Sequence, residues 1–246
     1  MGGPKIEKIE DIEASLPTWE FLQKLPEAIG DFKKVPGRGI EGQILYIVSY
    51  VDEAHHRQLD LTYTKETFDY IPLKVIGLHS FRDERYYCRD KERFANMMLE
   101  HLPDILASMS YDCIMSFGYE AKEVKFEEWE YWKELPKKIG SFELFITPDR
   151  PVTYINGSTI FLDYSDFEQQ STIYFLFNGL RVEVFADMLQ GNVPVTTNAF
   201  TVPKENNKGR RAKLEPYKIL PQFTELLKQN LEEHVQKLAE KKFFTI

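Results

Sequence analysis

Residues 19–32 recur without a gap as residues 129–142, with Trp, Glu, Leu, Pro, Ile, Gly and Phe identical at matching positions. A match at a long, fixed period indicates a repeated structural unit, and it constrains the fold more than any local propensity. We therefore interpret the chain as two copies of one unit, joined head to tail.

The repeated block has the apolar spacing of a helix. Trp19, Leu22, Leu25 and Ile29 lie three or four residues apart, as do their counterparts in the second copy, which predicts an amphipathic helix opening each unit. Pro26 and Pro136 would break or restart this helix, because proline lacks an N–H group. Gly30 and Gly140 suit the left-handed conformation that closes a helix.

Hairpin signals follow, most clearly in the second copy. Runs 152–155 and 158–164 flank Asn156-Gly157, and runs 172–177 and 180–186 flank Asn178-Gly179. Asn-Gly between β-rich runs favours a tight hairpin, since both turn residues tolerate a positive φ. Runs 43–50, 58–63 and 68–76 match them in the first copy. We expect four antiparallel strands per copy.

Each copy then has a long amphipathic helix. Its apolar face is matched between the copies at one constant offset: Phe94, Met97, Met98, Leu102, Leu106 and Met109 with Phe223, Leu226, Leu227, Leu231, Val235 and Leu238. Pro103 predicts a kink or a break in the first of these helices. The short apolar runs 114–117 and 243–246 come next, and each reads as a fifth strand.

These elements predict an α+β fold in which helices cover a meander of antiparallel strands. We expect residues 1–17 to be a leader, 18–117 the first repeat, 118–127 a connector and 128–246 the second repeat, with a basic loop inserted within 190–221. The repeats are expected to pack as one pseudo-twofold body. A helix, a strand meander and a second helix resembles, in architecture only, secretion chaperones and other interaction modules.

Composition narrows the class of protein. The 43% of hydrophobic residues is ample for a buried core, and the net charge of −8 argues against nucleic acid as a partner. No apolar run is long enough to span a membrane. Two cysteines, Cys88 and Cys113, give no disulfide framework, so we expect a cytoplasmic protein without a cofactor or a metal.

The copies differ most in two segments, and these supply the candidate ligand-binding residues. Segment 204–213 contains four cations that could bind phosphate, carboxylate or an acidic surface: Lys208, Arg210, Arg211 and Lys213. The alternative interpretation is a solvated loop, because blocks of like charge with Asn and Gly commonly lack fixed structure.

Segment 79–89 is the densest cluster of reactive side chains. His79 and Arg85 are candidate ligand-binding residues, and Cys88, between Arg85 and Arg89, could have a lowered thiol pKa. No family-specific signature surrounds the cysteine, so a surface loop with a bystander thiol is the simpler interpretation. His55-His56 follows two acids, but adjacent histidines point to opposite sides of a strand, which favours a polar turn over a metal site.

Two classes of function fit these observations. Because no P-loop, dinucleotide-binding glycine pattern, nucleophile elbow, zinc-protease motif or Cys-x-x-Cys occurs, we expect a non-enzymatic binding protein of the adaptor, chaperone or toxin-neutralising kind, with a protein partner. The alternative is an enzyme or a small-anion-binding protein whose site lies between the repeats, formed by segments 79–89 and 204–213.

Overall fold

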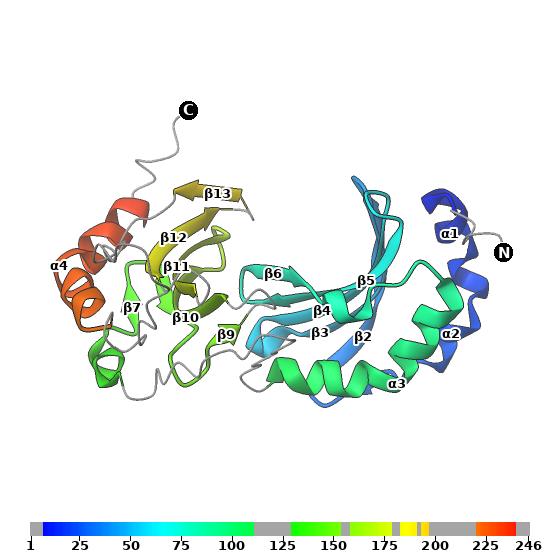
Figure 1. Cartoon of the computed structure of the whole chain (residues 1–246), viewed down its shortest axis with the longest axis horizontal. Coiled ribbons are helices and arrows are strands. Elements are labelled where there is room, and N and C mark those ends of the chain that lie inside the picture. Colours follow the sequence, from blue (N-terminus) through cyan, green and yellow to red (C-terminus); the bar gives the residue numbers. More distant parts are fainter. Residues whose placement is uncertain are drawn as a thin grey trace, which may run out of the picture. The chain divides into compact units, whose positions relative to one another are not determined.

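The computed structural model describes residues 7–110, 129–153, 158–178, 183–190, 193–196 and 220–239. It divides into unit 1, residues 1–111, and unit 2, residues 112–246. Each unit combines helices with an antiparallel sheet, so the protein belongs to the α+β class (Figure 1). The boundary falls after residue 111, slightly before the expected end of the first repeat.

Unit 1 is a six-stranded meander with helices on one face (Figure 1). Its helices are α1 (Ile9–Ser15), α2 (Glu20–Lys24) and α3 (Lys91–Ser110), with short 3-10 turns η1 (Leu16–Thr18), η2 (Glu53–His55) and η3 (Glu84–Tyr86). Its strands, paired in chain order, are β1 (Ala28–Ile29), β2 (Phe32–Glu41), β3 (Ile44–Asp52), β4 (Arg57–Thr64), β5 (Asp69–Ile76) and β6 (His79–Arg82).

The core of unit 1 lies between this sheet and its helices. Tyr70 of β5 stacks on Phe94 of α3 with ring centroids 5.3 Å apart, and Trp19, just before α2, also packs against Tyr70, with ring centroids 6.1 Å apart. The predicted stripe of α3 is buried, with Met97 only partly so. Ile9 and Ile12 of α1 are also buried, so the segment expected to be a leader contributes to this core.

Helix α3 runs unbroken through Pro103, so the expected break is absent. Figure 1 shows the helix curving along its length, which agrees with a kink. Proline removes one backbone donor from the helix, and neighbouring turns can hold the helix together while it bends.

The opening helix is much shorter than its apolar spacing predicts. Helix α2 ends at Lys24, and Ile29 lies in β1, which pairs with β2. Gly30 has a φ of +58°, as expected, but it turns a hairpin rather than closing a helix. Asp31, the second turn residue, is not among the residues with positive φ, a combination typical of a type II′ turn.

Unit 2 contains a seven-stranded sheet. It begins with η5 (Glu130–Glu134), followed by β7 (Lys138–Ile139), β8 (Phe142–Leu144), β9 (Val152–Thr153), β10 (Ser158–Asp166), β11 (Ser171–Asn178), β12 (Glu183–Gln190), β13 (Val193–Thr196) and α4 (Leu220–Ala239). The strand order is β13-β12-β11-β10-β8-β7, and β9 also pairs with β10. Both sheets have more strands than the four or five expected, and β1, β6, β7 and β8 are among those that were not predicted as strands.

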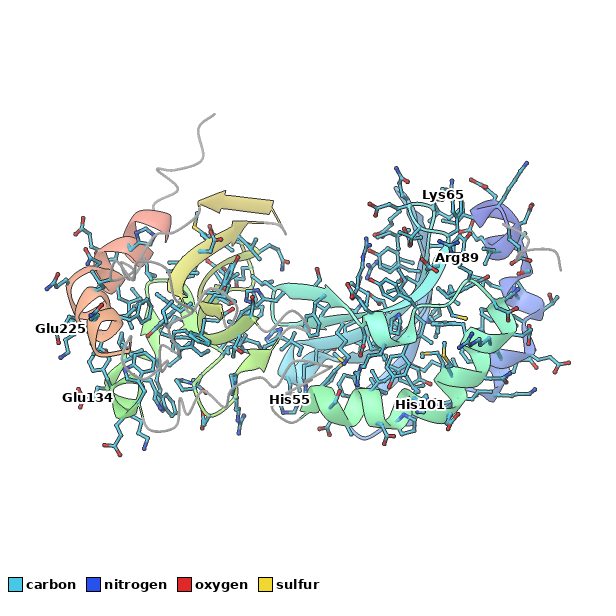
Figure 2. All side chains as sticks on the ribbon, in the orientation of Figure 1. His55, Lys65, Arg89, His101, Glu134 and Glu225 are labelled. Carbon is cyan, nitrogen blue, oxygen red and sulfur yellow. The ribbon has the colours of Figure 1, made fainter. Side chains whose placement is uncertain are left out.

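Aromatic side chains make up a large part of the core of unit 2. Phe223 of α4 packs edge-on against Phe161 and Phe175 of the sheet, with ring centroids 5.8 and 5.6 Å apart. Side chains fill the space between sheet and helix, and Glu134 and Glu225 lie on the helical side of the unit (Figure 2). The predicted stripe of α4 is largely buried as far as Val235. Runs 114–117 and 243–246 and the two Asn-Gly turns lie outside the described residues.

Positions matched in sequence have the same local geometry in both units. The hydroxyl of Tyr50 donates to the carbonyl of Pro26 at 2.6 Å, and that of Tyr164 donates to the carbonyl of Pro136 at 2.7 Å. The pairing of β3 with β4 shifts register around Ile47, and the pairing of β10 with β11 shifts at the equivalent Phe161. A β-bulge at equivalent positions of two sheets is a specific structural feature rather than a random irregularity.

No described helix has the length and apolar character needed to cross a membrane.

Candidate functional site

A groove with a volume of about 430 Å³ opens beside the outer edge of β2 in unit 1. Its walls come from the turn after α1, from α2 and from strands β2 and β3. The lining residues are Leu16, Pro17, Leu22, Glu27, Lys34, Val35, Pro36, Gly37, Ile47 and Val48. Val35 is one of only three large apolar side chains that are exposed among the described residues. The groove therefore offers an aliphatic surface that the fold does not cover.

Glu27 and Lys34 are the charged residues among those that line the groove. The Lys34 ammonium donates to the carbonyl oxygens of Leu22 and Leu25, at 3.4 and 3.1 Å, and pairs with the Glu27 carboxylate. The Lys34 side chain is 15% exposed and that of Glu27 is 84% exposed. The cation is thus fixed by backbone, while its counter-ion lies in solvent.

The same positions in unit 2 carry larger or uncharged side chains. Trp132 replaces Leu22, Leu144 replaces Lys34 and Phe145 replaces Val35. Trp132 and Leu144 pack against the core of unit 2, and Phe145 packs edge-on against Phe167 at 5.3 Å. The cation beside an aliphatic groove is therefore a feature of unit 1 that its counterpart positions do not reproduce.

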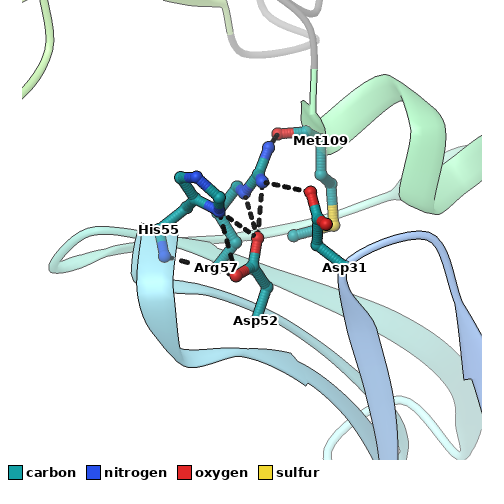
Figure 3. A network of polar contacts seen from close by, with 5 residues as sticks. All are labelled: Asp31, Asp52, His55, Arg57 and Met109. Atoms are coloured by element: carbon teal, nitrogen blue, oxygen red, sulfur yellow. Dashed lines mark hydrogen bonds and ion pairs between the residues drawn. The ribbon is translucent and has the colours of Figure 1, made fainter.

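A second constellation joins the β3–β4 turn to the end of α3 (Figure 3). Nε and Nη2 of Arg57 donate to Oδ2 of Asp52 at 3.0 and 2.5 Å, and Nη1 donates to the carbonyl of Met109 at 3.0 Å. Nδ1 of His55 lies 2.9 Å from the same Asp52 oxygen, and Asp31 lies 3.9 Å from Arg57 Nη2. Arg57 therefore ties the last turn of α3 to the sheet.

Asp31, Asp52 and His55 each offer one metal-ligating atom within 4.8 Å of the others. The Arg57 guanidinium already lies among these carboxylates, so a metal ion would have to compete with a fixed positive charge. This geometry favours an ion-pair anchor over a metal centre. It also places His55 in the polar turn expected from the sequence.

The Asp52 carboxyl has a pKa below its ordinary value. Burial acts to raise this pKa, because desolvation disfavours the charged form, but the hydrogen bonds from Arg57 and His55 outweigh the desolvation. Asp52 is therefore held as an anion. Its side chain is only 2% exposed, so the pair with Arg57 is a buried one.

Segment 79–89 contributes Asp83 to a buried ion pair. The Lys74 ammonium is 2.9 Å from Oδ2 of Asp83, and both side chains are 1% exposed. Arg85 donates to both oxygens of Asp83, and His79 is buried at 1% exposure. The charges of Asp83 and Arg85 are thus compensated within unit 1, and neither Lys74 nor His79 is accessible to a ligand.

Cys88 is a buried thiol rather than a surface one. It is 7% exposed, its Sγ donates to the carbonyl of Asp90 at 3.3 Å, and its backbone forms a bridge to Tyr70. Arg89, its neighbour, lies 3.5 Å from Asp69. The cysteine therefore serves to join the segment before α3 to the sheet.

Each sheet also has a buried carboxylate on the face away from its helix. Asp60 accepts from Ser49 at 2.5 Å and from Gln58 at 2.6 Å, while Asp163 accepts from Ser165 at 2.5 Å and from Thr172 at 2.9 Å. These hydroxyls donate to a carboxylate rather than to a histidine, so the pairs do not form the hydrogen-bond relay of a serine nucleophile. They satisfy buried polar groups.

Lys208, Arg210, Arg211 and Lys213 lie outside the described residues. The groove, in contrast, was not predicted. Its lining comes from separate elements without a shared motif, and the available signal was the run Val35-Pro36-Gly37 next to Lys34 in a strand that is otherwise amphipathic.

Comparison of the chain with models of known protein families, with curated proteins and with solved structures found no match.

Proposed function

We propose that the protein is a binding protein whose unit 1 receives an aliphatic side chain of a partner polypeptide in the β2 groove. The observation that carries this proposal is the groove itself. It is open, its walls are aliphatic, and it contains Val35, which is 37% exposed at the sheet edge. Exposed apolar surface in a concave site commonly marks an interaction site.

The chemistry of the lining supports binding rather than catalysis. Glu27 and Lys34, the charged lining residues, neutralise each other, and the other lining residues have no nucleophilic or acid–base side chain. Residues that could do chemistry, such as His79 and Cys88, are buried elsewhere in unit 1. The groove therefore provides apolar contact area with one charged edge.

The expected affinity of a single side chain is modest. Fully burying a leucine or isoleucine side chain contributes about 1.5–3 kcal/mol, which is roughly ten- to a hundredfold in a dissociation constant. Binding through this groove should therefore be reversible, with further contacts supplied by the backbone of the partner.

Chemical-shift mapping with isotope-labelled protein tests the proposal. The probe is a short Gly-Ser peptide with a leucine, and the expected result is a set of shifts confined to Leu22, Val35 and Ile47 and their neighbours. Val35→Glu should abolish these shifts, since it places a charge in the groove. Leu99→Glu is the matched control, because Leu99 has a similar exposure of 39% but lies on α3.

Two results would overturn the proposal: no shift at the groove with any aliphatic peptide, or equal binding by the Val35→Glu variant. Both variants replace an exposed side chain, so each should fold, and an unchanged circular dichroism spectrum verifies this.

The alternative function, an enzyme or a small-anion site between the repeats, depends on segment 204–213, which lies outside the described residues. Segment 79–89, which would form the other half of that site, does not support the alternative function, because His79 is buried and Arg85 donates hydrogen bonds to Asp83.

A further inference from the structure

We infer, resting on the proposed function, that the groove recognises the carboxyl terminus of its partner. An aliphatic last residue occupies the apolar floor, and the terminal carboxylate takes the place of Glu27 on the Lys34 ammonium. The partner chemistry is therefore a free carboxylate attached to a leucine-, valine- or isoleucine-like side chain.

Lys34 is prepared for such a ligand. Two of its three ammonium protons point to the carbonyl oxygens of Leu22 and Leu25, which fixes the direction of the third. That third position faces Glu27. Because the lysine side chain is only 15% exposed, its charge needs a counter-ion nearby, and a ligand carboxylate satisfies the same requirement.

Glu27 is the exchangeable partner. Its side chain is 84% exposed, so leaving Lys34 returns it to water with little desolvation or packing loss. Exchange of one carboxylate for another keeps the number of hydrogen bonds on Lys34 unchanged. The net gain then comes from the apolar side chain that the ligand brings with its carboxylate, whereas Glu27 brings none into the groove.

The edge of β2 disfavours the other common mode, in which a partner adds a strand. The N–H of Lys34 points away from β3, towards the outer edge of β2, and donates to the carbonyl of Glu27 at 2.8 Å. Pro36, two residues on, has the same orientation and no N–H. Two successive outward positions thus lack a free donor, so recognition by a chain end fits this edge better than an internal extended segment.

Fluorescence anisotropy with two labelled probes tests the inference. One probe is a Gly-Ser peptide ending in Val-Leu with a free carboxylate, and the other is the same peptide with a terminal amide. We expect the acid to bind about two- to fivefold more tightly than the amide, the range for a partly exposed ion pair.

Three variants make the test specific. Lys34→Met should remove the preference for the acid, and Lys33→Met, which changes the exposed neighbouring lysine, should retain it. Glu27→Gln removes the internal competitor, so it should tighten binding of the acid and leave binding of the amide unchanged. Should Lys34→Met fail to fold, Glu27→Gln alone decides, since Glu27 is exposed.

The outcomes separate the two proposals. If acid and amide bind the groove equally, or Glu27→Gln has no effect on the acid, the carboxyl-terminus inference is wrong and the proposed function stands. If neither peptide binds, both are wrong. Loss of the acid preference in Lys33→Met as well would indicate general attraction to positive charge and would also overturn the inference.

Discussion

Substitutions at single positions account for a difference in hydrogen bonding between the two units. The indole N–H of Trp129 donates to Thr224 on α4 at 2.6 Å. Trp19 occupies the matching position in unit 1, and Ala95 stands where α4 has Thr224. The indole N–H of Trp19 is buried and has no hydrogen-bond partner among the described residues. Unit 1 therefore carries a polar group whose desolvation is uncompensated.

Thr224→Ala should reproduce this situation in unit 2. Leaving a buried N–H without an acceptor costs about 1–3 kcal/mol, so we expect the free energy of unfolding to fall by that amount. Ala95→Ser, which offers Trp19 an acceptor, should change stability in the opposite direction or leave it unchanged. Chemical denaturation measures both, and a neutral Thr224→Ala would show that the Trp129 hydrogen bond contributes nothing.

The buried pair of Asp52 and Arg57 should make stability depend on pH. The pKa of Asp52 is lowered by folding, so its contribution is present above the unfolded value of about 4 and is lost as the pH falls through the folded value. Arg57→Leu, which leaves Asp52 buried without its cation, should cost about 3–5 kcal/mol near neutrality.

The loss in free energy of unfolding caused by Arg57→Leu should become smaller as the pH falls and Asp52 becomes protonated. Denaturation at several pH values checks this, with Lys24→Leu as a control for an exposed ion pair. A penalty that stays constant down to acid pH would contradict the assignment of Asp52 as the charged partner.

At the scale of elements, apolar spacing predicted the long helices well but misassigned the opening block. The stripes of α3 and α4 are largely buried, as predicted, because each helix is long enough for its period to be unambiguous. The block after Leu25 and Leu135 instead forms a hairpin, since its apolar positions are shared by helix and strand periods. The positive φ of Gly30 was predictable from the sequence, but its position in a hairpin turn rather than at a helix end was not.

Two glycines of unit 1 should differ in their response to alanine. Gly30 has a positive φ and open space where a Cβ atom would lie, so Gly30→Ala should cost only the conformational penalty of about 1–2 kcal/mol. At Gly37 a Cβ atom would lie 2.0 Å from the carbonyl oxygen of Tyr46, so the bulged β2–β3 pairing must move. Thermal unfolding should rank Gly37→Ala as clearly the more destabilising, and equal effects would contradict the close approach of the two strands.

Most of the candidate site could not be predicted from the sequence, because its residues come together only through tertiary contacts. The groove combines Leu16, Leu22, Lys34 and Ile47, which share no motif and no period. Arg57 likewise reaches Met109, fifty-two residues away, and nothing local signals that contact. The sequence did indicate where polar and charged segments lie. In segment 79–89, Asp83 and Arg85 form ion pairs within unit 1.

At the scale of the whole molecule, the chain forms two compact units, each with its own sheet, helices and apolar core. Sequence-matched positions share a glycine turn, a tyrosine-to-proline hydrogen bond and a strand bulge. These details agree with the repeated unit predicted from the sequence match, and the duplication itself stays a prediction. The units differ at the groove and at the indole contact.

A fragment of residues 1–111 should fold without unit 2, because its helices α1, α2 and α3 cover the sheet from within the same segment. Well-dispersed amide resonances and a cooperative unfolding transition would be the expected result. The peptide binding proposed for the groove should persist in this fragment, and a disordered fragment would show that unit 1 needs the rest of the chain.

The three tryptophans divide between the units, with Trp19 in unit 1 and Trp129 and Trp132 in unit 2. Each unit thus contains an intrinsic fluorophore of its own. Replacing Trp129 and Trp132 by phenylalanine leaves emission from unit 1 alone, next to the cation of Lys91, which lies 4.5 Å from the centre of the Trp19 ring. The chain therefore carries built-in optical labels for following the unfolding of its two halves separately.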